Sequence, residues 1–311
     1  ICHLRKRELI MRWVGMFPGQ GSQEIGMGNE LLEKYDELLI NTFEETLGWS
    51  LKDIINSEDP ELIKKTNIAQ PYIFSVSYCY GIETINNLGN PAALIGHSLG
   101  EYTALCLSGY LDFKDTLKVI AVRGEEMQKA VENSNTTMAA VLTSDLETTI
   151  EEIEKLNNQG IQIWISNFND PSQIVISSYI DDMNYLKSNP KALGAKRVIP
   201  LEVAGAFHTE IVSSAKKPLE DTLNEIDISK GNIPVYMNVD AKKVEVSTLK
   251  ENLVNQIDSS VLFNQQIEYV NKDIDPDLWC HIGPGNVTAG MVRKSISYKD
   301  LKVINSLESS K

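Results

Sequence analysis

A short apolar run that leads into a glycine-flanked serine restricts the fold of this chain more than any other feature. Residues 92–95 (AALI) have the length and composition of a buried strand, and GHSLG follows at 96–100. The next residues, up to Gly109, predict a helix. Glycines flank such a serine when the backbone of the turn is strained and its neighbours are closely packed. The stretch therefore predicts a strand–turn–helix unit with Ser98 at the turn.

The apolar pattern around this unit alternates strands with helices, which favours a parallel sheet covered on both faces. We expect strands at 13–17, 233–239 and 278–283, and helices at 29–47, 71–89, 99–108, 112–131, 213–226 and 248–271. Pro71 suits the first turn of its helix, and Gly89 suits the end. These elements predict an α/β fold with a hydrolase-like core.

The middle of the chain has a different order of elements. Strands are expected at 137–142, 161–169, 173–178 and 195–203, and helices at 145–158 and 180–188. This order is β-α-β-β-α-β, the ferredoxin-like pattern. We therefore expect a large α/β hydrolase-like subdomain formed by residues 11–133 and 202–311, with an inserted ferredoxin-like α+β subdomain at 134–201.

Charge and cysteine spacing exclude several kinds of partner. The 311 residues carry a formal net charge of −14, and a field of that sign repels phosphate, so we expect no nucleic-acid partner. The four cysteines have no metal-binding spacing and no run of 18 apolar residues occurs, so we expect no metal, no membrane span and a cytoplasmic location. Residues 1–10 lack an initiator Met, and we expect them to be an upstream remnant before a native start at Met11.

A serine nucleophile needs a base, and the chain has four histidines. His3 lies in the expected remnant, and His97 lies within the turn, where its side chain is expected to point away from Ser98. His208 follows a predicted strand and precedes a helix, which places it in a loop at the end of a sheet. His281 follows an apolar strand and equally suits a core position. We favour His208 as the base and keep His281 as the alternative, and no Asp stands out as a third member.

Six motifs occur in order between about residues 13 and 295. They are FPGQGSQ (17–23), GHSLGEYTAL (96–105), VRGEEMQ (122–128), NFNDPSQIVIS (167–177), GAFH (205–208) and HIGPG (281–285). Together they resemble the malonyl-CoA:acyl carrier protein transacylases, including the stand-alone acyltransferases that serve polyketide synthases. The resemblance implies transfer of a malonyl group from malonyl-CoA to the phosphopantetheine thiol of an acyl carrier protein, in fatty acid or polyketide biosynthesis. It implies no tightly bound cofactor, and we expect a monomer.

The resemblance also implies roles for individual residues. Ser98 would be the nucleophile that forms a malonyl-serine intermediate, and His208 would be its base. The backbone N–H groups of Gln20 and Leu99 would form the oxyanion hole. A backbone carbonyl near Gln266 would orient the histidine in place of a carboxylate, although the segment LFNQQIEYV departs from the family's proline-containing form.

Three further residues would contact the substrate. Arg123 would pair bidentately with the free malonyl carboxylate, the alternative being a solvated helix charge. Asn169 would lie near the acyl and pantetheine arm, and a turn formed by Asn-Asp-Pro is its alternative. Phe207 would crowd the C2 methyl of branched extender units, unless it only packs in the core.

Three other functions are possible for such a chain. An acyl-carrier-protein thioester hydrolase on the same fold is the main alternative, and Arg123 argues against it because such enzymes handle acyl groups without a free carboxylate. A docking module without activity would not need both Ser98 and His208. A patatin-type lipase requires an Asp-Gly pair, which the sequence lacks.

Carrier proteins of this kind are acidic, so docking to an acidic enzyme requires a local basic patch. Two basic pairs are candidates, Lys216-Lys217 and Arg293-Lys294. The alternative is that these are ordinary solvated charges on helices.

Overall fold

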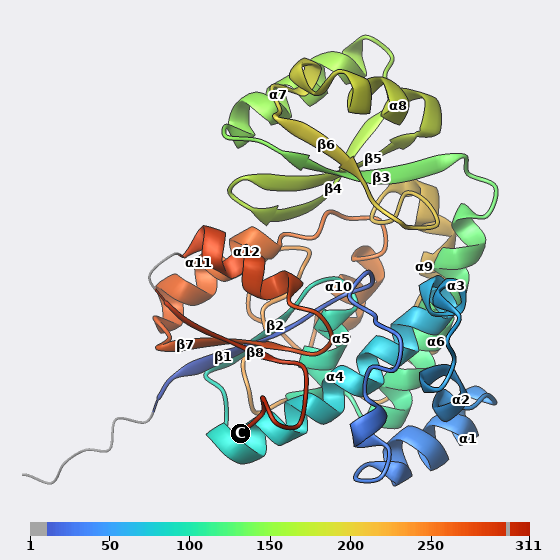
Figure 1. The fold of residues 1–311 in the computed structure, drawn as a ribbon, viewed down its shortest axis with the longest axis vertical. Coiled ribbons are helices and arrows are strands. Elements are labelled where there is room, and N and C mark those ends of the chain that lie inside the picture. Colours follow the sequence, from blue (N-terminus) through green and yellow to red (C-terminus); the bar gives the residue numbers. More distant parts are fainter. Residues whose placement is uncertain (1–10, 297–298) are drawn as a thin grey trace, which may run out of the picture.

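The computed structural model describes residues 11–296 and 299–311, and it contains two sheets, one above the other in Figure 1. The lower sheet is parallel and has the order β2-β1-β7-β8. Its strands are β1 (Trp13–Phe17), β2 (Ala93–Gly96), β7 (Leu278–Ile282) and β8 (Asp300–Ile304). The expected remnant at 1–10 lies outside the described residues.

Helices cover both faces of the parallel sheet, because alternate side chains of its strands point to opposite sides. Leu94 belongs to a core shared with α4, α5 and α6, whereas Val14 and Ile95 pack with α11 and α12. The helices of this subdomain are α1 (Phe43–Leu47), α2 (Leu51–Ile55), α3 (Pro60–Lys64), α4 (Thr66–Leu88), α5 (Gly100–Leu107), α6 (Phe113–Val131), α9 (Lys216–Asn224), α10 (Leu249–Asn255), α11 (Phe263–Ile274) and α12 (Val287–Ser295). The predicted α/β architecture is confirmed.

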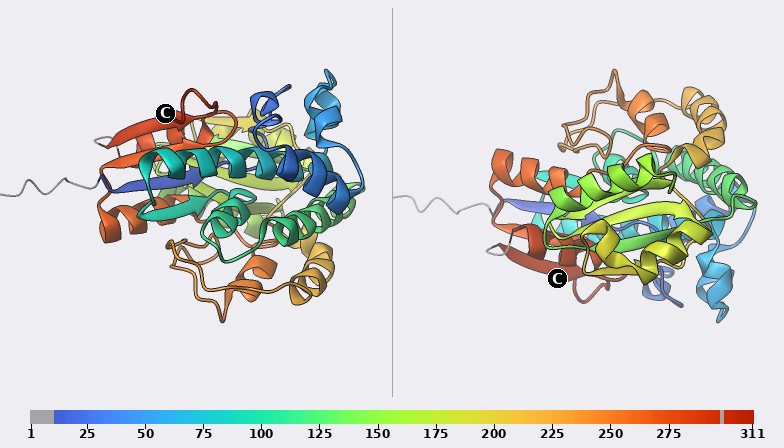
Figure 2. Two further views of the ribbon diagram at one scale, coloured as in Figure 1. Left: turned by 90° about the horizontal axis from the view of Figure 1, so that it is seen from below. Right: turned by 90° about the horizontal axis from the view of Figure 1, so that it is seen from above.

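The upper sheet is antiparallel and has the order β4-β5-β3-β6. Its elements are β3 (Thr136–Leu142), α7 (Leu146–Asn158), β4 (Ile163–Asp170), β5 (Gln173–Tyr179), α8 (Ile180–Ser188) and β6 (Arg197–Pro200). This succession is the predicted β-α-β-β-α-β order. Seen from above, this sheet lies over the parallel one (Figure 2). The predicted boundaries at residues 134 and 201 stay a prediction.

Two of the helices expected in the first third of the chain differ in the structure. The helix expected at 29–47 is divided into a 3-10 turn at Asn29–Leu31, a π-helical segment at Glu37–Thr42 and α1. The helix expected to begin at Pro71 begins at Thr66 instead. Its first N–H finds an acceptor on another helix, since the Oε1 of Gln128 lies 3.1 Å from the Thr66 nitrogen. That contact is tertiary, so local sequence could not indicate it.

The last third of the chain is less regular than predicted. The segment expected as a strand at 233–239 makes only two isolated bridges among the described residues, between Val235 and Leu94 and between Tyr236 and Lys243. The helix expected at 248–271 is interrupted between α10 and α11, where Val261 bonds to the backbone of β4. Strand β8 was not predicted. A 3-10 segment at Glu210–Ala215 precedes α9.

None of the helices in the described part of the chain has the length and apolarity needed to cross a membrane.

Candidate active site

Ser98 lies in a sharp turn between β2 and α5, with its backbone in the left-handed region at φ 51°. Two glycines make this turn possible. A Cβ atom on Gly96 would lie 1.9 Å from the carbonyl carbon of Gly100, and one on Gly100 would lie 2.2 Å from the carbonyl oxygen of Phe17. The N–H of Ser98 donates to the Oδ1 of Asn238 at 2.8 Å, which fixes the turn. The predicted strand–turn–helix unit is therefore present.

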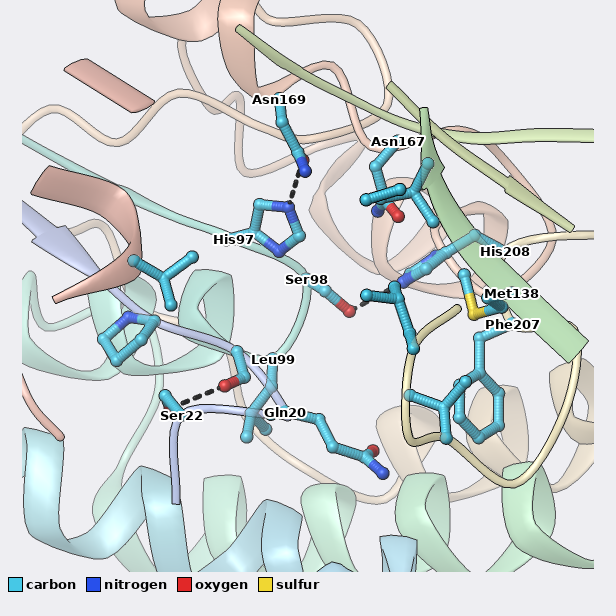
Figure 3. A pocket seen from close by; sticks show the side chains of 18 of the residues that line it. Gln20, Ser22, His97, Ser98, Leu99, Met138, Asn167, Asn169, Phe207 and His208 are labelled. Carbon is cyan, nitrogen blue, oxygen red and sulfur yellow. Dashed lines mark hydrogen bonds between the residues drawn. The ribbon is translucent and has the colours of Figure 1, made fainter. Parts of the chain in front are cut away.

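His208 contacts Ser98 from the loop that follows the antiparallel sheet (Figure 3). Its Nε2 lies 2.7 Å from the Ser98 Oγ, and its Nδ1 lies 2.8 Å from the carbonyl oxygen of Gln256. A carbonyl can only accept, so Nδ1 carries the proton and Nε2 is left to accept one. Burial, and after it the charge of Arg123, lower the pKa of His208 to about 3. The ring is therefore neutral at neutral pH and able to take a proton from the serine.

Arg123 extends from α6 toward the same serine. Its Nη2 lies 3.0 Å from the Ser98 Oγ and 2.9 Å from the Gln256 Oε1, and its Nη1 lies 2.7 Å from the Gln70 Oε1. The side chain is only 1% exposed, so it is not a solvated helix charge. Burial lowers its pKa, and its hydrogen-bond partners among the described residues are neutral. A buried guanidinium with neutral partners favours an anion brought by a ligand.

Gln20 and Leu99 both line the cavity that contains Ser98. Gln20 comes from the loop after β1, and its side chain donates to the Oγ1 of Thr66 at 3.1 Å. Within residues 11–296 and 299–311, neither the Gln20 nor the Leu99 backbone N–H donates to another protein group. Unengaged N–H groups beside a nucleophile are what an oxyanion hole requires. Their role in catalysis stays a prediction.

The cavity around Ser98 has a volume of about 330 Å³ and is lined by strands of the antiparallel sheet and by loops and helices around the parallel sheet. That size lies within the range of small-molecule sites. The antiparallel sheet supplies an apolar wall formed by Met138, Ala140 and Val175. Phe207, which directly precedes the histidine, is 6% exposed and also lines the cavity (Figure 3).

Asn169 lines this cavity from the end of β4, but protein groups engage its amide. The Nε2–H of His97 donates to its Oδ1 at 2.9 Å (Figure 3). The Nδ2 of Asn169 donates to the Oε1 of Gln173 at 3.0 Å. The imidazole of His97 is thus hydrogen-bonded to Asn169, in agreement with the expectation that its side chain points away from Ser98. The turn that follows is held by Asp170, whose Oδ1 accepts from the Ser172 N–H. A contact of Asn169 with substrate stays a prediction.

The prediction that a carbonyl near Gln266 orients the histidine is wrong. The carbonyl that His208 contacts belongs to Gln256, ten positions earlier. Gln266 is buried in α11, and its Nε2 donates to the carbonyl oxygen of Tyr236 at 2.6 Å. The physical reason is the interruption between α10 and α11, because the end of α10 approaches the serine whereas α11 packs behind the sheet.

His281, the alternative base, occupies a core position. Its Nδ1 lies 2.6 Å from the Thr288 Oγ1 and its Nε2 lies 3.1 Å from the carbonyl oxygen of Pro284. Burial lowers its pKa to about 4. Both ring nitrogens are therefore used to hold the loop between β7 and α12.

Sequence reasoning missed Gln256 and Asn238. Gln256 accepts from His208 through its backbone and from Arg123 through its side chain. The Nδ2 of Asn238 donates to the carbonyl oxygen of Gly96 at 2.7 Å, and its Oδ1 accepts from the serine N–H. Both residues lie in segments without a motif. Asn238 had one local signal, a polar residue in the apolar segment 233–239, whereas Gln256 had none, since Asn255, Asp258 and Ser259 near it are polar as well.

The described part of the chain contains no group of three or more His, Cys, Asp or Glu side chains that could hold a metal ion.

Comparisons with known proteins agree with this geometry. The acyl transferase domain family matches residues 14–308. The malonyl CoA-acyl carrier protein transacylase of Bacillus subtilis is 39% identical over 285 residues, which cover 90% of this chain and 89% of that protein. The crystal structure of the corresponding transacylase from Clostridium perfringens has a TM-score of 0.87 at 32% identity and covers 96% of this chain and 94% of that chain.

A second similar structure contains a partner. It is a malonyl-transacylase in complex with a type II polyketide synthase acyl-carrier protein, with a TM-score of 0.88, 28% identity, and coverage of 96% of this chain and 97% of that chain. The family match spans most of the sequence and includes the serine turn, the histidine loop and the helix that carries Arg123. The chain therefore belongs to the acyl transferase family.

Proposed function

We propose that this chain transfers a malonyl group from malonyl-CoA to the phosphopantetheine thiol of an acyl carrier protein, through a malonyl-serine at Ser98. The observation that carries this proposal is the position of Arg123. A buried guanidinium with neutral partners lies 3.0 Å from the nucleophile oxygen. It would bind the free carboxylate of the malonyl group and hold the thioester carbonyl against the serine.

In the loading step, the Ser98 Oγ attacks the carbonyl carbon of the thioester while its proton moves to the Nε2 of His208. The Gln256 carbonyl stabilises the imidazolium that forms, in place of a carboxylate. The backbone N–H groups of Gln20 and Leu99 would donate to the oxyanion of the tetrahedral intermediate. When the C–S bond breaks, the sulfur of CoA takes the proton from His208 and leaves as the thiol.

In the transfer step, the same groups act in reverse order. The thiol of the carrier's phosphopantetheine gives its proton to His208 as its sulfur attacks the acyl carbon. The C–O bond to Ser98 then breaks, and the serine oxygen recovers the proton. The apolar wall formed by the antiparallel sheet would exclude water from the ester, which favours transfer over hydrolysis.

Phe207 lies on the wall of the acyl cavity, and Asn169 at the end of β4. We assign Phe207 to excluding a C2 methyl branch and Asn169 to the region of the pantetheine arm. A single methyl group is discriminated by only about 1–3 kcal/mol, so Phe207 would favour malonyl over methylmalonyl without making the choice absolute.

Hydrolysis of acyl groups on a carrier protein is the second candidate function. It needs the same serine and histidine, and no observation favours it over transfer. A hydrolase for uncharged acyl groups would place an unpaired arginine in its own acyl pocket, which is costly.

The proposed setting is a fatty acid or polyketide pathway in the cytoplasm, with an acyl carrier protein as partner and no tightly bound cofactor. The free cysteines Cys79, Cys106 and Cys280 are buried thiols, which is typical of proteins from reducing compartments. We propose that the chain acts as a monomer.

Intact-mass spectrometry of the protein with malonyl-, methylmalonyl- and acetyl-CoA tests the proposed function. Wild type is expected to gain the mass of one malonyl group and to lose it again when a carrier protein with its phosphopantetheine is added. Ser98→Ala should gain none, and Ser77→Ala, at a buried serine outside the cavity, is the matched control. If the malonyl group is released as free acid at the same rate with and without carrier, the hydrolase function is supported instead.

A further inference from the structure

Glu101 is a buried carboxyl group to which the mechanism above assigns no role. It lies on α5, three residues after Ser98, and its side chain is fully buried at 0% exposure. Its Oε2 accepts from the Nε2 of Gln256 at 2.7 Å and from the backbone N–H of Asn238 at 3.1 Å. Its Oε1 is buried and has no hydrogen-bond partner among the described residues.

The contacts of its Nε2 with Glu101 and with the carbonyl oxygen of Ser98 decide which way the amide of Gln256 points. An amide has a donor end and an acceptor end. The donor end, Nε2, faces Glu101 and the carbonyl oxygen of Ser98, which lies 3.0 Å away. The acceptor end, Oε1, is thereby left to face the Nη2 of Arg123 at 2.9 Å. A flipped amide would direct an NH₂ group at the guanidinium, so Glu101, together with the Ser98 carbonyl, holds the arrangement that Arg123 requires.

The charge of Glu101 depends on opposing influences. Burial favours the neutral acid and raises its pKa to about 8, and Asp240 acts in the same direction. The hydrogen bonds from Gln256 and Asn238, and the charge of Arg123, favour the carboxylate. The neighbouring Tyr102 has its own pKa raised by burial, so it stays neutral.

A ligand carboxylate on Arg123 would change this balance. It would neutralise the guanidinium, which is the cation that favours the ionised form of Glu101, and it would add a second negative charge to a buried site. Two anions and one cation in such a site are unfavourable. The neutral acid keeps Oε2 as an acceptor for Gln256, so it can hold the amide without adding a charge.

We propose that Glu101 is a positioning and specificity-determining residue for acyl groups that carry a carboxylate, because it orients Gln256 toward Arg123 and does so as a neutral acid whenever such a group is bound. This inference rests on the proposed function. It implies that an acyl donor with a carboxylate binds only when Glu101 is protonated. An uncharged donor binds whether Glu101 is protonated or ionised.

The test is the pH dependence of the loading step. The half-saturating concentrations of malonyl-CoA and acetyl-CoA are measured for the first half-reaction between pH 6.5 and 9.5, in wild type, Glu101→Gln and Glu83→Gln. In wild type, the value for malonyl-CoA should rise by up to about tenfold per pH unit above the pKa of Glu101, because binding requires one proton. The value for acetyl-CoA should change much less, and it corrects for titration of the CoA moiety.

Glu101→Gln keeps an oxygen acceptor for Gln256 but cannot ionise. Its half-saturating concentrations of malonyl-CoA and acetyl-CoA should therefore change with pH to the same extent. Glu83 is a buried glutamate on α4 whose partners are Tyr35 and Lys34, and Glu83→Gln should follow wild type. Equal pH profiles in wild type and Glu101→Gln would overturn the proposal. If Glu101→Gln does not fold, a malonyl-to-acetyl ratio in wild type that is constant with pH overturns it. Failure of malonyl-CoA to load at any pH would overturn the proposed function as well.

Discussion

At Arg123, one side chain combines three properties that rarely occur together. It is almost fully buried, it is charged, and its partners Gln70, Gln256 and Ser98 are uncharged groups. The planar guanidinium offers paired donors that match a carboxylate, whereas a lysine would offer a point charge. The identity of the acyl group is therefore expected to depend on this residue more than on the shape of the cavity.

Arg123→Ala should lower kcat/KM for malonyl transfer by at least about tenfold, since hydrogen bonds to charged groups contribute about 1.5–3 kcal/mol. The same change should make acetyl-CoA a relatively better donor, because the buried charge that disfavours neutral acyl groups is gone. Arg123→Lys should restore little. Steady-state kinetics with both donors in the three proteins provide the measurement, and a malonyl-to-acetyl ratio shared by all three would show that Arg123 does not read the carboxylate.

At the scale of single elements, helix α12 connects the cavity with the surface. Val287, Thr288 and Met291 from its first turns line the cavity. Near its end, the Nζ of Lys294 lies 3.2 Å from Asp170 of β4, and Arg293 is exposed. Arg293 is thus an exposed cation at the end of α12 that is farther from the cavity.

Helix α9 differs in this respect. Lys216 pairs with Asp258 at 3.0 Å, and Lys217 lies 2.6 Å from Asp221 on its own helix. Acidic neighbours compensate both charges. Of the two basic pairs considered as carrier contacts, the pair on α12 is therefore the better candidate.

Arg293→Glu should raise the KM for an acidic carrier protein several-fold, because it reverses a charge at the solvent end of α12. Loading from malonyl-CoA should not change, since Arg293 does not line the cavity. Lys217→Glu is the matched control and should alter neither quantity. Both half-reactions are measured separately, and an unchanged carrier KM in Arg293→Glu would remove α12 from the docking surface.

Across the whole molecule, buried histidines make stability depend on pH. The pKa of His208 is lowered to about 3 and that of His281 to about 4, in both cases first by burial. In the unfolded chain these side chains would titrate at about 6.5. Between that pH and their lowered values, the unfolded chain binds protons that the native state does not. The native state therefore loses stability as pH falls from about 6.5 toward 4.

Removing His281 should reduce this loss. The folded and unfolded pKa values of His281 imply a contribution on the order of 3 kcal/mol between pH 7 and pH 4. Urea unfolding at pH 7 and pH 4.5 gives the change in the free energy of unfolding between the two pH values, for wild type and for His281→Gln. The variant is expected to be less stable at pH 7 and to lose less on acidification. Equal losses in the two proteins would mean that His281 does not titrate on unfolding.

The sequence by itself determined the units whose causes are local. Gly96 is required by contacts within the turn itself, with the backbone of Gly100 and Glu101, so GHSLG predicted the position of Ser98. A short apolar run predicted the central strand β1, and the succession of strand-like and helix-like segments predicted the order of elements in the antiparallel sheet, because each segment shows its own local pattern. The resemblance pointed to His208 and Arg123 through short motifs, since each lies on a segment with a recognisable sequence.

Only the tertiary structure decided which distant groups complete the site. Gln256 lies where α10 ends, and no local pattern indicates that its carbonyl reaches His208, so sequence reasoning chose Gln266 instead. Thr66 begins α4 because Gln128 on another helix accepts its N–H. Whether Arg123 is solvated or buried was also open until α6 was packed against the serine turn. A contact between residues far apart in the chain depends on how whole elements pack, and a single sequence carries no local record of that packing.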